Sequence, residues 1–90
     1  MAAVLAAAVY EDTIRRMGFM FAGITDRPKL QMVINSLKER GTLKGAQVSI
    51  AQSYLPFRND ALHADWGKIE RESIMSVLGF VEELLVKHFS

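Results

Sequence analysis

The residue types best suited to chemistry lie together in one short segment, which contains Arg58, Asn59, Asp60 and His63. Arginine is a permanent cation whose planar fork of N–H donors suits a phosphate group. Histidine is the side chain whose ordinary pKa lets it take up or release a proton near neutral pH. A guanidinium beside an imidazole is the combination that metal-free phosphodiester chemistry needs, so this segment is the candidate site.

Simpler explanations of the same residues stay open. An arginine and a histidine lie this close together by chance in many chains, and a histidine near a helix end is more often a surface or capping residue. Arg58 with Asp60 or Asp65 can form a surface ion pair, which contributes less than about 1 kcal/mol to stability.

Size and charge limit the class of protein. Ninety residues make a single domain over residues 1–90, and an apolar fraction of 50% is that of a globular protein and excludes disorder. A chain this short buries roughly 60–65% of its unfolded surface, so only modest stability is expected. The formal net charge of +1 gives no general attraction for nucleic acid or anionic lipid, so such binding requires a local patch.

Cysteine and histidine usage argues against metal sites. The chain has no cysteine, which excludes disulfides and thiolate ligands and is typical of a cytoplasmic protein. Its two histidines, His63 and His88, are 25 positions apart, and no helical His/Glu spacing joins them, which argues against zinc. We therefore expect no metal and no cofactor.

The apolar residues 1–9 are similar to the core of a signal peptide, but their context is wrong. They lack a basic leader, and Tyr10, Glu11 and Asp12 follow where a small-residue cleavage site belongs. The run is also too short to span a bilayer, so we expect no membrane partner. We interpret it as the start of a helix. Because no capping residue precedes it, we expect that the chain begins inside a longer element or lacks an upstream helix.

Hydrophobic periodicity predicts four helices and no strands. The first covers about residues 2–17 and is weakened at its end by Gly18, after which residues 18–26 form an apolar connector. The second follows the start signal at residues 25–28, where Thr25 or Asp26 caps and Pro28 lies in the first turn, and it closes at residues 40–41. We expect its buried stripe to consist of Leu30, Val33, Ile34 and Leu37.

The third and fourth helices are expected over about residues 47–64 and 70–88. The expected apolar stripe of the fourth contains Ile74, Val77, Leu78, Val81, Leu84 and Leu85, and its outer side carries Glu82, Glu83 and Lys87. Together the pattern predicts an all-α fold, a small antiparallel four-helix bundle. Met17, Phe19, Met20 and Phe21 are expected to seal the core or a dimer interface.

Pro56 interrupts the third predicted helix. A proline in a helix interior removes a hydrogen bond at a cost of ~3 kcal/mol, and it disfavours helical dihedrals at Leu55. We expect a kink near Leu55 or a new short helix with Pro56 in its first turn. His63 then falls in the last turn, where the helix dipole favours its protonated form.

Helix geometry makes the candidate site depend on a second chain. Five positions correspond to about 140° of rotation and about 7.5 Å of rise, so Arg58 and His63 do not point at one spot. Asn59 and His63, four positions apart, do share a face. A two-fold axis beside this helix would bring both copies of Arg58 and His63 around one cleft. A functional site here therefore predicts a homodimer.

The pattern in residues 58–63, an arginine, a polar residue, three more residues and a histidine near the end of a helical bundle, resembles the HEPN superfamily of nucleotide-binding domains. Residues 5–16, 58–66 and 80–85 are similar to one bacterial and archaeal branch of that superfamily. In other members an acidic residue of the first helix faces the motif, which nominates Glu11 or Asp12 here.

The resemblance implies a dimeric four- or five-helix domain and, in many members, a metal-independent endoribonuclease that acts as a toxin, in phage defence or in RNA processing. It implies that His63 is a general acid or base, that Arg58 holds the scissile phosphate and that Asn59 orients His63 or the phosphate. Supporting residues would be Glu11, Asp12 and Asp60. RNA and an antitoxin or other partner protein are the implied partners. Other members are binding modules, so the alternative is a non-catalytic nucleotide- or protein-binding module that keeps the motif structurally.

Overall fold

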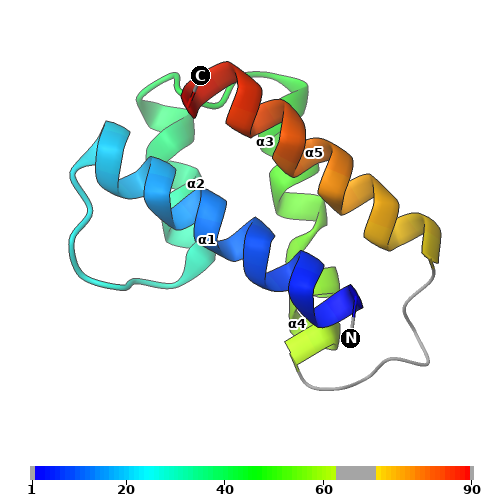
Figure 1. The fold of residues 1–90 in the computed structure, drawn as a ribbon. Coiled ribbons are helices and arrows are strands. Elements are labelled where there is room, and N and C mark those ends of the chain that lie inside the picture. The colour runs from blue at the N-terminus through cyan, green and yellow to red at the C-terminus, as the bar shows by residue number, and fades with distance from the viewer. Residues whose placement is uncertain (1, 63–70, 90) are drawn as a thin grey trace.

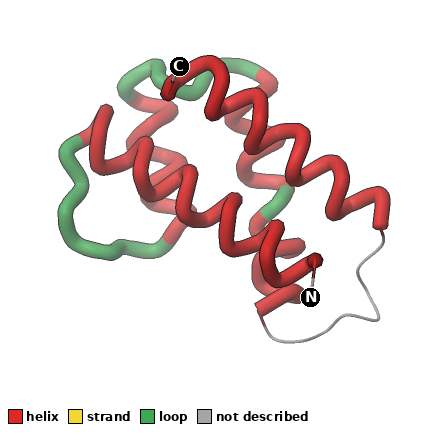
Figure 2. The backbone as a smooth tube through the Cα atoms, viewed as in Figure 1, coloured by secondary structure: helices red, strands yellow, loops and turns green. Residues whose placement is uncertain are grey.

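The structure, a computed structural model, describes residues 2–62 and 71–89. All regular structure in these residues is helical, which confirms the all-α prediction (Figures 1 and 2). The helices are α1 (Ala2–Ala22), α2 (Leu30–Glu39), α3 (Ala46–Ser53), α4 (Leu55–Leu62) and α5 (Arg71–Phe89). None of these described helices is long and apolar enough to cross a membrane.

Helix α1 continues through Gly18, so the predicted end at residue 17 is wrong. A Cβ atom at Gly18 would lie 2.7 Å from Cγ1 of Val33, so the missing side chain is what lets α2 pass close to α1. The helix ends instead at Gly23, whose φ of 66° is in the left-handed region that glycine tolerates. Ile24 closes the end by donating its N–H to the carbonyl of Gly18 at 3.1 Å.

Helix α2 starts later than the start signal predicts. It begins at Leu30, and Lys29 precedes it without a side-chain capping bond, so neither Thr25 nor Asp26 is the cap. Pro28 lies outside the helix, and its carbonyl accepts a hydrogen bond from Arg15 Nη1 at 2.9 Å. A tertiary contact with α1 therefore outweighs the local capping signal. The stripe of Leu30, Val33, Ile34 and Leu37 is buried, as predicted.

The predicted third helix is two helices, α3 and α4, separated at Tyr54, which confirms the break expected from Pro56. The hydroxyl of Tyr10 on α1 donates to the carbonyl of Ala51 in the last turn of α3. Burial raises the pKa of Tyr10, so this hydroxyl stays protonated and can donate. The Tyr10 and Tyr54 rings meet edge to face, with centroids 6.2 Å apart. Contacts from α1 thus hold the point at which α3 ends and α4 begins.

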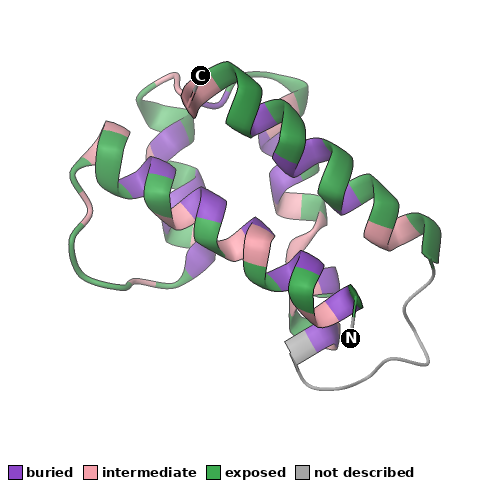
Figure 3. Ribbon diagram, in the orientation of Figure 1, coloured by how far each residue is buried: buried purple, intermediate pink, exposed green. Residues whose placement is uncertain are grey.

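The buried face of α5 is narrower than the predicted stripe. Val77, Val81 and Leu84 are buried, as expected, but Leu78 and Leu85 are 38% and 41% exposed and Phe80 is buried instead. The reason is that α5 packs chiefly on α1, and a single neighbouring helix covers only one strip of its surface. Figure 3 shows α1 and α5 each buried along one face and exposed along the other. Glu82, Glu83 and Lys87 are exposed, as predicted.

Helices α1 and α5 run in the same direction, where an antiparallel bundle was expected (Figure 1). Their C-terminal ends meet, with Phe21 5.7 Å from His88 and 6.4 Å from Phe89 between ring centroids. The connector between α1 and α2 is residues 23–29, where residues 18–26 were expected. It folds back along α1 until the carbonyl of Pro28 accepts a hydrogen bond from Arg15.

The core is organised around α1, which packs on α2, α4 and α5. The large side chains of α1 that are completely buried are Tyr10, Ile14 and Met17. Ala3, Ala6 and Ala7 are also buried, so the N-terminal apolar run is the core-facing start of a helix, as interpreted from the sequence. Of the apolar residues expected to seal the core or a dimer interface, Met17 lies in the core and Phe21 packs against it, while Phe19 and Met20 are 61% and 55% exposed.

Candidate functional site

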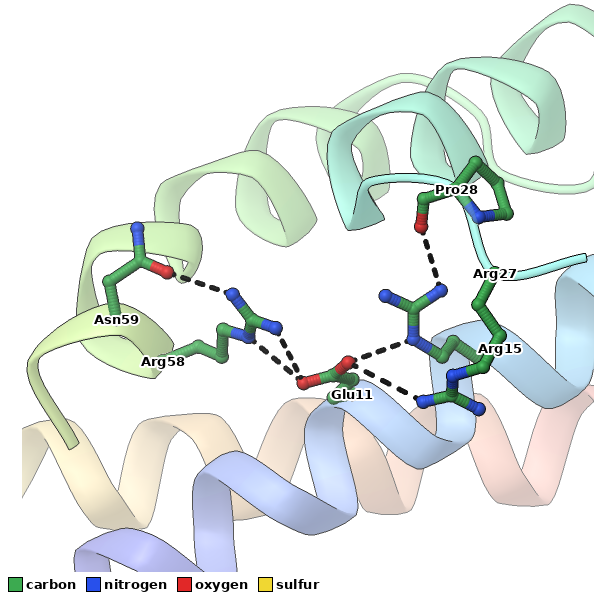
Figure 4. A network of polar contacts seen from close by, with 6 residues as sticks. All are labelled: Glu11, Arg15, Arg27, Pro28, Arg58 and Asn59. Carbon is green, nitrogen blue, oxygen red and sulfur yellow. Dashed lines mark hydrogen bonds and ion pairs between the residues drawn. The ribbon is translucent and has the colours of Figure 1, made fainter. Parts of the chain in front are cut away.

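Arg58 on α4 reaches across to α1 and is held there by Glu11 (Figure 4). Both Nε and Nη2 of Arg58 lie 2.9 Å from Oε1 of Glu11. The remaining terminal nitrogen, Nη1, donates to Oδ1 of Asn59 at 3.0 Å. The backbone supports this position because Arg58 N–H donates to the carbonyl of Tyr54, at the break before α4. The structure therefore brings three predicted site residues, Arg58, Asn59 and Glu11, into one network.

Glu11 also binds arginines from two other parts of the chain. Its second oxygen, Oε2, lies 2.8 Å from Nε of Arg15 and 4.0 Å from Nη2 of Arg27. Arg15 in turn donates to the carbonyl of Pro28, which ties the connector to the same group. We call Glu11, Arg15, Arg27 and Arg58 the Glu11 cluster.

The Glu11 cluster carries an excess of positive charge, because three guanidinium groups surround one carboxylate. Burial alone would raise the pKa of Glu11, but the hydrogen bonds and charges of Arg15 and Arg58 outweigh it and hold the pKa below its usual range. Glu11 is therefore ionised at neutral pH and is a poor general base. The cluster is suited to bind an anion.

Arg58 keeps donors that its internal contacts do not use. Its side chain is 26% exposed, whereas the side chain of Glu11 is 17% exposed. A guanidinium has more N–H groups than the bonds to Glu11 and Asn59 consume. An oriented arginine with spare donors and partial exposure can donate hydrogen bonds to a phosphate oxygen without leaving its present partners.

The other two acidic candidates are not part of this network. Asp12 pairs with Arg16 at 2.7 Å on the solvent side of α1, where their side chains are 62% and 69% exposed. That pair is solvated, whereas Glu11 and Arg15 are largely covered, with both side chains 17% exposed. Within the part of the chain that the structure describes, no hydrogen bond or ion pair joins Asp60 to Arg58.

His63 lies outside the described residues, and so do Asp65 and Trp66. The geometry relating His63 to Arg58 and Asn59 therefore stays a prediction. Over residues 2–62 and 71–89, no group of histidine, cysteine or acidic side chains could hold a metal ion.

Sequence reasoning missed Arg27 and the groove beside it. The groove lies between the C-terminal half of α1, the connector and the end of α5, and encloses about 540 Å³. Residues that line it include Arg15, Phe19, Met20, Ile24, Arg27 and Phe89. We call it the connector groove. The sequence carried one hint, because the apolar run Phe19, Met20 and Phe21 follows the predicted end of the first helix and was expected to pack on the core or a dimer interface.

Comparison with family models, curated proteins and solved structures finds no match to this chain. The described residues define an all-helical domain with a cationic cluster centred on Glu11. Membership of the HEPN superfamily stays a prediction from residues 58–63 and their flanks.

Proposed function

We propose that this chain is a HEPN-like domain that binds RNA and cleaves it without a metal ion, at a site formed by Arg58 and His63 from both subunits of a homodimer. The observation that carries the proposal is the arginine held by Glu11 and Asn59, five residues before the histidine that could supply acid–base chemistry.

Arg58 would bind the scissile phosphate and stabilise the charge that grows on its oxygens. Such stabilisation is effective when the donors are oriented before the reaction, because no free energy is then spent on reorganisation in the transition state. The bonds from Nε, Nη2 and Nη1 fix the plane of the guanidinium. Glu11 acts here as a positioning residue, and Asn59 orients Arg58 through its side-chain oxygen.

His63 would act on the ribose. One imidazole takes the proton from the 2′-hydroxyl as its oxygen attacks phosphorus, and the bond from phosphorus to the 5′-oxygen breaks. The second imidazole of the dimer, in its protonated form, gives a proton to the leaving 5′-oxygen. The products are a 2′,3′-cyclic phosphate and a 5′-hydroxyl, and no metal ion takes part.

A specific observation favours a second function. Every hydrogen bond described for the Arg58 side chain is made inside the domain, so Arg58 also fastens α4 to α1. On this reading the motif is structural, and the chain is a non-catalytic nucleotide- or protein-binding module.

The test is to incubate the purified chain with mixed-sequence RNA in EDTA and to identify the ends of the products. We expect cleavage to persist and to leave 2′,3′-cyclic phosphates. His63→Ala should lower the rate by about 10²–10⁴-fold. His88→Ala is the matched control, because His88 is the chain's other histidine and lies at the opposite end of α5 from residues 63–70.

Two outcomes contradict the nuclease proposal. One is an absence of cleavage, or cleavage that EDTA abolishes. The other is an equal loss in His63→Ala and His88→Ala, which would point to destabilisation or a contaminating enzyme. RNA binding without cleavage would favour the non-catalytic module.

A further inference from the structure

The connector groove and the Glu11 cluster share two residues, Arg15 and Arg27. Arg58 and Arg27 approach opposite oxygens of the same carboxylate, Oε1 and Oε2 of Glu11 (Figure 4). A ligand group bound to Arg58 would therefore be separated from the groove only by the carboxylate of Glu11. A chain-like ligand could occupy both.

Arg27 is the cation of the groove with the least internal engagement among the described residues. Its side chain is 76% exposed, and its nitrogen lies 4.0 Å from Glu11, which is too long for a hydrogen bond. Arg15, by contrast, is occupied by Glu11 and Pro28. The N–H groups of Arg27 are thus available to an incoming anion.

The charges that line the groove leave a positive balance. Arg16 is neutralised by its pair with Asp12, and Arg15 by its bond to Glu11. The remaining lining charges, Asp26 and Arg27, are opposite and equal. Arg58 lies next to the groove, and because Glu11 already balances Arg15, the charge of Arg58 is the excess positive charge. An anionic ligand fits this balance.

The groove also exposes the aromatic ring of Phe19, which binding of a small anion alone would not require. Phe19 is 61% exposed and Met20 is 55% exposed, and both line the groove beside the arginines. Single-stranded nucleic acid is bound by just this pair of features, cations for the phosphates and aromatic rings on which bases stack. An acidic peptide would use the arginines but not the ring.

We propose that the connector groove binds the single-stranded RNA that flanks the phosphate held by Arg58, with Arg27 on a neighbouring phosphate and Phe19 against a base. This inference rests on the proposed RNA function. It adds to it a second subsite, on residues outside the Arg58–His63 segment, and a preference for unpaired RNA.

The test uses binding rather than cleavage. A fluorescein-labelled 2′-O-methyl RNA of about 12 random nucleotides, within the usual span of single-strand sites, cannot be cut by its own 2′-oxygen. Its Kd is measured by anisotropy over a range of salt concentrations for wild type, Arg27→Ala and Phe19→Ala. Arg40→Ala and Met32→Ala are the matched controls, since both residues are exposed and neither lines the groove. Melting curves check that every variant is folded.

We expect Arg27→Ala to raise Kd about two- to fivefold, the effect of one exposed ion pair. It should also reduce the slope of log Kd against log salt by about 0.7, as one lost phosphate contact does for a single strand. Phe19→Ala should raise Kd at least about fivefold, the lower bound for one stacked base. The controls should match wild type, and a fully paired duplex should bind more weakly than the single strand.

The outcomes separate the two proposals. If wild type binds RNA and Arg58→Ala weakens binding, while Arg27→Ala and Phe19→Ala match their controls, the groove inference is overturned and the proposed function stands. If wild type does not bind the RNA, both are overturned. If polyglutamate displaces the RNA and Phe19→Ala has no effect, the groove is a site for an acidic peptide and the inference is wrong.

Discussion

Replacing Glu11 by glutamine removes the charge that holds Arg15 and Arg58 while keeping the size of the side chain. Glu11 accepts hydrogen bonds from Nε of Arg15 at 2.8 Å and from Nε of Arg58 at 2.9 Å, and Nη2 of Arg58 forms an ion pair with it at 2.9 Å. An exposed ion pair contributes up to about 1 kcal/mol, and breaking a fully buried one costs about 3–5 kcal/mol. With side chains 17–26% exposed, we expect Glu11→Gln to lower the free energy of unfolding by about 2 kcal/mol.

Urea unfolding followed by circular dichroism measures this loss, and a thermal melt should show a Tm lower by about 8–16 °C for a domain of this size. Asp12→Asn is the matched control, because it removes the neighbouring carboxylate from an exposed pair with Arg16. We expect the control to stay within about 0.5 kcal/mol of wild type. If Glu11→Gln and Asp12→Asn destabilise the domain equally, the reasoning about the Glu11 cluster is wrong.

Three further predictions concern pH, packing and assembly. Because the pKa of Glu11 is lower in the fold than its unfolded value of about 4.3, its contribution to stability is present above that pH and is lost as pH falls through the folded pKa. The difference in unfolding free energy between wild type and Glu11→Gln should therefore shrink in acid, and a constant difference would contradict this. Gly18→Ala should destabilise the domain by about 1–3 kcal/mol, since its Cβ would overlap Val33. The control Gly79→Ala, in open space on α5, should stabilise it by about 0.5–1 kcal/mol, and two changes of the same sign would refute the packing argument. Sedimentation at micromolar concentration should show a homodimer, and a monomer there would contradict a site built from two subunits.

Features set by local physics could be predicted from the sequence. The buried stripe of α2 follows from its apolar spacing, and the break before α4 follows from the missing N–H of Pro56. Features set by tertiary approach could not. A glycine such as Gly18 is common at helix ends, which is why the first helix was expected to stop there. Only its proximity to Val33 shows that it lies where α1 and α2 pass close together. The parallel course of α1 and α5 is likewise a tertiary feature that no local pattern encodes.

The candidate site shows the same division. The bond between Arg58 and Asn59 joins neighbours in the sequence. For the acidic partner of Arg58 on α1, the sequence left two candidates, Glu11 and Asp12. One residue is about 100° of helix rotation, and the buried positions Ala7 and Ile14 place Glu11, not Asp12, at the edge of the core. Arg27 comes from the connector, whose path over α1 no local pattern encodes.

The central claim is that Arg58 binds a phosphate and does more than fasten α4 to α1. Lysine at this position keeps the charge and can still pair with Glu11, but it loses the planar fork. We therefore expect Arg58→Lys to lie within about 1 kcal/mol of wild type in stability, with Arg58→Ala about 2 kcal/mol lower, close to the loss in Glu11→Gln.

The decisive measurement is the rate of RNA cleavage in EDTA for wild type, Arg58→Lys and Arg58→Ala, at a temperature where all three are folded. We expect both variants to lose about 10²–10³-fold in rate, as removal of a transition-state donor does, although only Arg58→Ala loses much stability. A rate that follows stability, with Arg58→Lys close to wild type, would show that Arg58 is a structural residue and does not bind the phosphate.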